Sequence, residues 1–313
     1  MTTAIDLFAG YGGFSTGAIQ AGARVAWAAN HWPHAVETHA LNHRSTKHAC
    51  QDLRQADFAQ LPDYDLLLAS PSCQGHSQAA QPSRKRDGRV RETHDAYRAT
   101  AFAVVDCADV TRPKALLVEN VVDFKRWALF DLWCQMLERL GYKLTMKELW
   151  AHHMGVPQRR KRLFIAGALG EAPSLDFERE PEPAFGPCID WDDGHWRPWG
   201  DCPPVARERI RRAQDKRGKR FITQHVSNHP GVPLHESIRT ITTKDQWGVV
   251  DGDLYRPLTQ REVARAMGFP DDYQTKATTR GDWMRGYGNS VPPPVARRLV
   301  GRVGQYAASD CAA

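Results

Sequence analysis

Short apolar runs alternate with helix-like patterns along the first half of the chain. The apolar runs cover residues 4–8, 25–29, 64–69, 115–118 and 163–168, and each has the length of a buried strand. Apolar residues at helical spacing occupy residues 33–41, 97–110 and 127–140. This alternation predicts an α/β fold, a mostly parallel sheet with helices on both faces. Such sheets bind ligands beyond the carboxyl ends of their strands.

The pattern changes near residue 169. Residues 171–204 contain seven prolines and little periodicity, and a basic stretch follows them. Thr259 and Glu262 form a capping-box pair that predicts one further helix, and residues 294–306 predict another. We therefore expect a first domain over residues 1–169 and 285–313 and a smaller, less regular domain over 170–284, with its variable part at about 171–235.

Composition narrows the class of protein. The 313 residues are 42% hydrophobic and 25% charged, which is typical of a globular protein and excludes global disorder or a coiled-coil rod. No run approaches 18 apolar residues and the start of the chain lacks a secretory pattern, so we expect a cytoplasmic protein without a membrane segment. The seven cysteines form no closely spaced pair, so we expect neither a disulfide framework nor a metal site.

Positive charge is concentrated in two places. Residues 205–220 hold eight basic and two acidic side chains, an excess equal to the +6 of the whole chain. Residues 84–91 hold five basic side chains and one acidic. Each run alone is consistent with a solvated surface. Two such runs in an otherwise balanced chain favour a polyanionic partner.

A glycine-rich turn follows the first apolar run. Residues 6–14 lead from a predicted strand into a helix, where backbone N–H groups and small residues allow a ligand to approach closely. The dinucleotide fingerprint GxGxxG is satisfied at Gly10 and Gly12 but fails at Ser15. The turn alone therefore indicates either a ligand site or a tight structural turn.

Three further segments carry candidate chemistry. Cys73 follows the run 64–69 among Pro, Gly, Gln, His and Ser, which favours a nucleophile over a small buried side chain. Glu119 ends another apolar run and indicates a general acid, a helix cap or an ion-pair partner. Gln158, Arg160 and Arg162 alternate along an extended segment, so they should share one face that could hold a phosphate or a base edge.

Together these segments resemble the cytosine-5 DNA methyltransferase family, of the bacterial or phage type. The resemblance covers nearly the whole chain except about residues 171–219. The matching motifs occur in the family's order at residues 6–13, 71–77, 119–121, 158–162, 239–242, 258–273 and 288–292. Seven motifs in order are far more specific than any one of them.

The resemblance implies a covalent mechanism. Cys73 would add to carbon 6 of a cytosine, Glu119 would interact with ring nitrogen 3, and Arg160 and Arg162 would hold the base and order the site. The cytosine would be flipped out of the duplex, under a loop formed by residues 74–92. The base that removes the carbon-5 proton is not assigned by the resemblance.

The resemblance also implies a Rossmann-like domain that binds S-adenosylmethionine and a small target-recognition domain. The implied cofactor-binding residues are Asp6, Phe8, Gly10, Gly12, Gly13, Phe14, Asn30, His31, Asp52, Leu53, Pro71, Asn289 and Ser290. The implied DNA-binding residues are Gln74, Ser77, Arg84, Lys85, Arg86, Arg209, Arg212 and Arg217. Three positions depart from the family pattern. Asn30 stands where the family has an acidic residue, His31 where it often has an apolar or aromatic one, and Ser72 where it has proline.

The expected partner is double-stranded DNA with a short target of about two to four base pairs. We expect a monomer in the cytoplasm of a bacterial or phage-infected cell, and a cognate restriction endonuclease is left open. Two alternatives are a tRNA cytosine-5 methyltransferase and a catalytically silent DNA-binding protein. The tRNA branch carries a Cys-Phe-Thr element, which is absent here because Ile and Pro follow Cys188 and Cys202. The silent binder draws only on Ser72 and Asn30.

Overall fold

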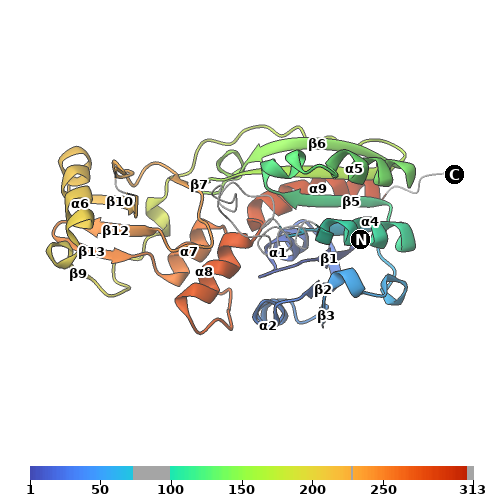
Figure 1. Ribbon diagram of the computed structural model, residues 1–313, viewed down its shortest axis with the longest axis horizontal. Coiled ribbons are helices and arrows are strands. Elements are labelled where there is room, and N and C mark those ends of the chain that lie inside the picture. Colours follow the sequence, from blue (N-terminus) through green and yellow to red (C-terminus); the bar gives the residue numbers. More distant parts are fainter. Residues whose placement is uncertain (73–98, 227, 309–313) are drawn as a thin grey trace. The chain divides into compact units, whose positions relative to one another are not determined.

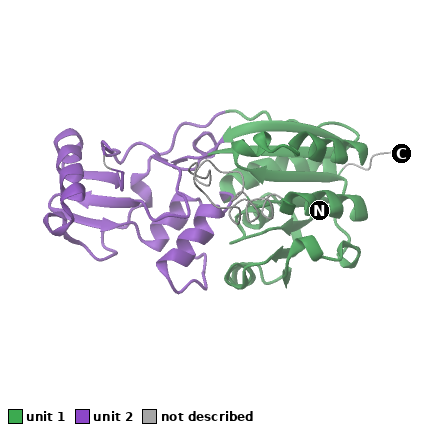
Figure 2. Cartoon of the chain, in the orientation of Figure 1, with its two compact units in different colours: residues 1–149, 161–178, 293–313 green, residues 150–160, 179–292 purple. Residues whose placement is uncertain are grey.

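The computed structural model describes residues 1–72, 99–226 and 228–308 (Figure 1). The chain forms two compact units (Figure 2). Unit 1 comprises Met1–Leu149, Lys161–Glu178 and Pro293–Ala313, and unit 2 comprises Trp150–Arg160 and Arg179–Pro292. These limits differ from the expected ones in three places, because residues 150–160 and 285–292 belong to the second unit and residues 170–178 belong to the first.

Unit 1 is built on one seven-stranded sheet. Its strands are β1 (Thr3–Leu7), β2 (Arg24–Asn30), β3 (Lys47–Cys50), β4 (Leu66–Ala69), β5 (Ala115–Asn120), β6 (Tyr142–Trp150) and β8 (Lys161–Leu169). Its helices are α1 (Gly13–Gln20), α2 (Pro33–Asn42), α4 (Phe102–Thr111), α5 (Phe130–Arg139) and α9 (Pro293–Ala308). Short 3-10 turns lie at Leu53–Gln55, Phe58–Gln60, Ala99–Ala101 and Val122–Arg126.

The strand order is β3-β2-β1-β4-β5-β8-β6 (Figure 1). Strands β1 to β5 pair in parallel, and β8 runs antiparallel to β5. The mostly parallel α/β sheet predicted from the apolar runs is thus confirmed. Strands β2 and β3 lie on one side of β1, and β4 and β5 lie on the other. The carboxyl ends of β1 and β4 therefore flank the switch point at which such sheets place their ligand site.

Alternate residues of the central strands face the two helical layers. Leu67, Val118 and Ile165 belong to a core that also contains Val104 of α4 and Trp133 of α5. The intervening strand residues point the other way, because side chains alternate across a strand. On that side α1 and α9 pack closely, since a Cβ added at Gly17 would lie 2.4 Å from the Cβ of Ala296.

Unit 2 contains an antiparallel sheet with the order β10-β12-β13-β9. Its strands are β9 (Arg197–Pro198), β10 (Arg220–Gln224), β12 (Trp247–Asp251) and β13 (Leu254–Pro257). Helix α6 (Pro204–Arg217) covers it through Ile210 and Ala213, which pack in a core with Phe221, Val250 and Tyr255. Further elements are β7 (Gln158–Arg159), β11 (Ile238–Arg239), α7 (Gln260–Ala266) and α8 (Arg280–Asn289), with 3-10 turns at Ala151–Met154, Gly186–Cys188 and Trp199–Asp201.

The segment 150–160 joins unit 2 for a local reason. Strand β7 pairs in parallel with β11, so Gln158 and Arg159 lie beside Ile238 and Arg239. The predicted capping box of α7 is present, because Thr259 and Glu262 each bond the other's backbone. No helix in the described part of the chain is both long enough and apolar enough to cross a membrane.

Candidate active site

The glycine turn of unit 1 has a strained backbone. Phe8 adopts φ 62°, a left-handed conformation that residues with a side chain rarely take. Gly10 and Gly12 adopt φ 55° and 80°, and the N–H of Gly12 donates to the carbonyl of Ala9 at 2.9 Å. Helix α1 begins at Gly13 directly after this turn. Strain of this kind persists only where surrounding structure enforces it, and it often marks a functional site.

Asp6 lies under the turn rather than on it. Its side chain is fully buried, and Ser15 Oγ donates to Asp6 Oδ2 at 2.7 Å. Burial raises the pKa of Asp6 to about 7, against the lowering effect of its bonds with Ser15. Phe14 is also buried, at 2% exposure. Asp6 and Phe14 therefore hold the turn from inside. Gly12 and Gly13 are buried as well, whereas Phe8 and Gly10 are partly exposed.

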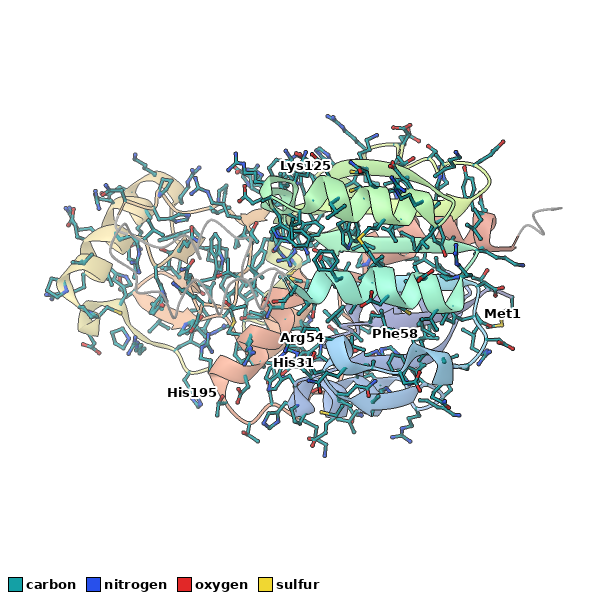
Figure 3. The ribbon with its side chains drawn as sticks, turned by 45° about the vertical axis from the view of Figure 1, so that its right-hand side comes forward. Met1, His31, Arg54, Phe58, Lys125 and His195 are labelled. Carbon is teal, nitrogen blue, oxygen red and sulfur yellow. The ribbon has the colours of Figure 1, made fainter. Side chains whose placement is uncertain are left out.

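The end of β2 presents a second candidate surface. Asn30 Oδ1 accepts the backbone N–H of Trp32 at 2.9 Å, which fixes the chain as it leaves the strand. The ring of Trp32 stacks on Tyr11 of the glycine turn, with centroids 5.8 Å apart and planes 13° from parallel. Next to them His31 is exposed. Asn30 and His31 thus adjoin the turn, in the part of unit 1 where Figure 3 labels His31.

Asp52 begins the 3-10 turn at Leu53–Gln55, where its side chain accepts the N–H of Arg54 at 3.0 Å. The Arg54 guanidinium also donates to both carboxylate oxygens of Asp52, and this bonding lowers the pKa of Asp52. Leu53 is buried beneath the pair at 2% exposure. Arg54, labelled in Figure 3, is a residue that sequence reasoning missed, although Asp and Arg two residues apart is a recognisable pair.

The ends of β4 and β5 are joined by a side chain. Asn120 Nδ2 donates to the carbonyl of Pro71 at 3.1 Å, and the N–H of Ser72 donates to Thr100 Oγ1 at 3.2 Å. These bonds fix the segment that immediately precedes Cys73. Cys73 itself lies outside the described residues, as do Gln74, Ser77, Arg84, Lys85 and Arg86.

Glu119 and Arg162 form an ion pair beside this segment. Glu119 is 6% exposed, and its Oε1 lies 3.2 Å from Arg162 Nε. The antiparallel pairing of β5 with β8 sets this contact, because Glu119 is paired with Phe164, two residues after Arg162. The arginine thereby orients the carboxyl group of Glu119.

Gln158 and Arg160 act within unit 2 instead. Gln158 Oε1 accepts the N–H of Ile241 at 2.8 Å, and its Nε2 donates to the carbonyl of Ala266 at 3.3 Å. Arg160, 2% exposed, donates to the backbone carbonyls of Ile241, Gly288 and Ser290. The three alternating residues therefore do not share one surface: two bind backbone inside unit 2, and Arg162 binds Glu119 in unit 1.

Asn289 and Ser290 lie at the carboxyl end of α8 in unit 2. Ser290 is buried, and its Oγ donates to the carbonyl of Gly286 at 2.8 Å. Asn289 is exposed. Of the two, Asn289 is the side chain that can contact a ligand.

The basic helix α6 separates its arginines by burial. Arg212 and Arg217 are exposed, as expected of residues that contact phosphates. Arg209 is 6% exposed and donates from Nε to Thr223 Oγ1 at 3.2 Å. It faces β10 because positions 209, 210 and 213 lie on the inner side of the helix. The structure thus places Arg209 in the packing of unit 2, away from the exposed face.

No group of three or more histidine, cysteine or acidic residues in the described ranges is arranged to hold a metal ion.

Comparison with known proteins decides the family. The family model of C-5 cytosine-specific DNA methylases matches residues 2–185 and 189–305. The chain belongs to this family. Among bacterial relatives of this methylase, the Type II methyltransferase M.NlaX of Neisseria lactamica is 28% identical, over 95% of this chain and 94% of the relative. M.HgiDI of Herpetosiphon aurantiacus, also a Type II methyltransferase, is 29% identical over 96% and 94%.

Solved structures agree on the fold of this methylase. A putative DNA modification methyltransferase encoded within an Escherichia coli prophage aligns with a TM-score of 0.71 at 19% identity, covering 98% of this chain and 99% of that one. The resemblance drawn from the seven motifs is confirmed, and the methylase is a DNA (cytosine-5)-methyltransferase.

Proposed function

We propose that the methylase performs catalysis at the carboxyl ends of β4 and β5, with Cys73 as nucleophile and Glu119 as acid. The observation that carries this proposal is the bond from Asn120 to Pro71. It ties the strand end that bears Glu119 to the segment directly before Cys73. Arg162 supports the assignment because it holds Glu119 Oε1 from the neighbouring strand.

The chemistry explains these residue types. The Cys73 thiolate adds to carbon 6 of a flipped cytosine, and the electron pair of the 5,6 double bond moves toward carbon 5. Glu119 donates a proton or hydrogen bond to nitrogen 3, which takes up the charge that develops in the ring. Carbon 5 then attacks a methyl group. Loss of the carbon-5 proton to a base restores the double bond and releases Cys73.

S-adenosylmethionine supplies an electrophilic methyl group when bound. The glycine turn fits such a group because, among the described residues, the space at Gly10 is open: an added Cβ there would have Phe8 O, at 3.9 Å, as its one neighbour within 4 Å. The Asp52 carboxylate is about one-third exposed beside Arg54 and can accept a further bond from an adenine amine, and the Asn30 amide can donate to a ribose oxygen. We assign Phe8, Gly10, Gly12, Gly13, His31, Leu53 and Pro71 to the cofactor site of unit 1, with Asp6 and Phe14 shaping it from inside. For Asn289 and Ser290 of unit 2, the proposal of a role in cofactor binding rests on the motif resemblance alone.

Double-stranded DNA is the proposed partner, read by unit 2 at a site of about two to four base pairs. Arg212 and Arg217 on the exposed side of α6 support this, since exposed guanidinium groups bind phosphates without regard to sequence. All proposed catalytic and recognition residues lie on one chain, so one copy suffices for each site. The Type II relatives suggest that the methylase protects DNA against a cognate restriction endonuclease.

The test is mass spectrometry of nucleosides from DNA of cells that express the methylase. We expect 5-methylcytosine with the wild type and with Cys134→Ala, a control at a buried cysteine of α5. We expect none with Cys73→Ala, and a loss of about 100-fold or more with Glu119→Gln. Mapping the modified positions then gives the target sequence.

Methylation by Cys73→Ala would exclude the proposed nucleophile. Modification confined to tRNA would instead identify RNA as the substrate. A wild-type protein that binds DNA tightly but forms no covalent adduct with 5-fluorocytosine DNA would be a silent binder. A mapped site longer than about six base pairs would contradict the short target.

A further inference from the structure

A series of hydrogen bonds runs beneath the glycine turn of unit 1. Ser15 Oγ lies 2.7 Å from Asp6 Oδ2, and the same oxygen lies 3.0 Å from His39 Nε2. His39 Nδ1 lies 2.8 Å from His48 Nε2. Asp6, Ser15 and His39 are buried, whereas His48 is half-buried on β3. The series therefore leads from the interior, under the turn, to the edge of the sheet.

A second branch reaches the other end of the same turn. Thr16 Oγ1 donates to the carbonyl of Gly12 at 2.7 Å, so its only proton is already engaged. His43 Nε2, 3.2 Å from Thr16 Oγ1, must then be the donor of that contact. The rings of His39 and His43 are 4.4 Å apart. Two histidines one helical turn apart thus hold both ends of the turn.

The charge states of these groups are set by burial. Burial lowers the pKa of His39 far below its ordinary value, lowers that of His43 to about 4, and lowers that of His48 as well. The three rings are therefore neutral at pH 7. Asp6 behaves differently, because burial raises its pKa to about 7 and its Oδ1 has no hydrogen-bond partner in the described part of the chain. The strand residues paired with Asp6 are Ala28 and Leu68, which carry no charge.

A neutral histidine can carry its proton on either ring nitrogen, so the hydrogen bonds of this series can all point toward Asp6 or all point toward His48. When Asp6 is ionised, His48 donates to His39, His39 to Ser15, and Ser15 to Asp6. When Asp6 is protonated, every one of these bonds reverses. Conversion from the second state to the first moves one proton along each bond toward His48, whose other ring nitrogen then releases a proton to water. The balance is one proton transferred from Asp6 to solvent, with every ring neutral before and after.

We propose that Asp6, Ser15, His39 and His48 are positioning residues that couple cofactor binding to the release of a proton. When the cofactor binds on the glycine turn, Asp6 loses its proton, and a proton leaves the protein through His48. This inference rests on the proposed function, since it takes S-adenosylmethionine as the ligand of the turn. The physical reason is charge: the cofactor carries a sulfonium cation, and a cation above the turn favours the ionised carboxylate below it. Binding and ionisation of Asp6 then assist one another.

Calorimetric titration of the full chain with S-adenosylmethionine tests the coupling, in two buffers of different ionisation enthalpy from about pH 6 to pH 8. We expect proton release near neutral pH and an apparent affinity that rises about tenfold over this range, because only the ionised fraction binds well. Asp6→Asn, which cannot ionise, should bind with no such proton release and a flatter profile. The amine of the ligand titrates equally with both proteins, so their difference reports Asp6. S-adenosylhomocysteine, which lacks the sulfonium charge, should release fewer protons.

Substitutions at Ser15 distinguish proton coupling from a purely structural role of the hydrogen-bond series. Ser15→Ala removes a bond that favours the ionised carboxylate, so the break in affinity should move to higher pH by about one unit. Ser15→Thr retains the hydroxyl and should restore it, and Ser45→Ala, at an exposed serine of the same unit, should change nothing. A purely structural role would lower affinity by the same factor at every pH. Should Asp6→Asn fail to fold, the two Ser15 variants decide the matter.

Two outcomes would overturn the inference and can be told apart. If wild type and Asp6→Asn bind S-adenosylmethionine with the same proton release and the same pH profile, the coupling is absent and the proposed function stands. If the wild type binds no S-adenosylmethionine at any pH, both fail.

Discussion

Three arginines of this methylase show how burial decides the role of a residue. Arg160 serves three backbone carbonyls of unit 2, Arg162 serves one carboxylate of unit 1, and Arg209 packs beneath its own helix against Thr223. A guanidinium has five N–H donors in a rigid plane, so it can satisfy several acceptors at once. Each of the three therefore acts first on the protein itself.

We expect Arg160→Lys to lower the free energy of unfolding by about 2 to 4 kcal/mol. One ammonium group cannot reach the three carbonyls, so buried acceptors lose their donor. Urea unfolding against the wild type measures the change. Arg139→Lys, at an exposed position of α5, is the matched control and should stay within about 0.5 kcal/mol. Equal midpoints for both variants would contradict the role given to Arg160.

At the scale of elements, the sequence predicted best where burial was most complete. Strands β4 and β5 are apolar throughout most of their length and were expected to within about two residues, because a central parallel strand is covered on both faces. The edge strands β3 and β6 were missed, since their mixed polar and apolar residues match a half-exposed surface. The sheet of unit 2 was missed for another reason: β10 pairs with β12 more than twenty residues away, and local pattern does not specify such a partner.

The packing of α1 against α9 gives a prediction with an internal control. A Cβ at Gly17 would lie 2.5 Å from the carbonyl oxygen of Pro293 and 2.6 Å from the N of Arg297, and backbone atoms cannot move aside cheaply. We expect Gly17→Ala to destabilise the methylase by about 2 kcal/mol or more. Gly301 in α9 has open space around it, so Gly301→Ala should be neutral or stabilising by up to about 1 kcal/mol. Thermal and urea unfolding of both variants measure the contrast, and destabilisation by Gly301→Ala would refute this account of the helix pair.

At the scale of the whole molecule, the net charge of +6 favours attraction of DNA, but it does not indicate which surface binds the DNA. The sequence identified the strand ends that carry Glu119 and the glycine turn, because strand ends follow from apolar runs. The sequence did not show that Arg209 is buried, that Arg54 donates hydrogen bonds to the Asp52 carboxylate, or that histidines support the glycine turn. Those contacts join segments distant in sequence or depend on which side of a helix faces inward.

Charge on α6 can be tested through salt dependence. We consider the double variant in which Arg212 and Arg217 are both replaced by Gln. A plot of the logarithm of the binding constant against the logarithm of salt concentration should lose about one unit of slope for each phosphate contact removed, about two in all. Arg139→Gln, exposed on unit 1, is the control and should leave the slope unchanged. The measurement is binding of a fluorescent duplex between about 50 and 200 mM salt. An unaltered slope in the double variant would mean that this face of α6 does not meet DNA.

Stability of the whole molecule should depend on pH through Asp6. The carboxyl loses its proton near 3.8 in the unfolded chain but only near 7 in the folded one. Between these values the folded state holds a proton that the unfolded state lacks, so this contribution to stability falls as pH rises and is lost above about pH 7. Asp6→Asn removes that loss. The unfolding free energy of the variant relative to wild type should therefore increase from about pH 5 to pH 7 by about 1 to 3 kcal/mol and then level off.

The histidines contribute in the opposite direction, because their depressed pKa values weaken the fold as pH falls below about 6.5, but they do so equally in both proteins. Urea unfolding of the ligand-free chain at each pH isolates the difference, and a constant difference would show that Asp6 does not titrate in this range.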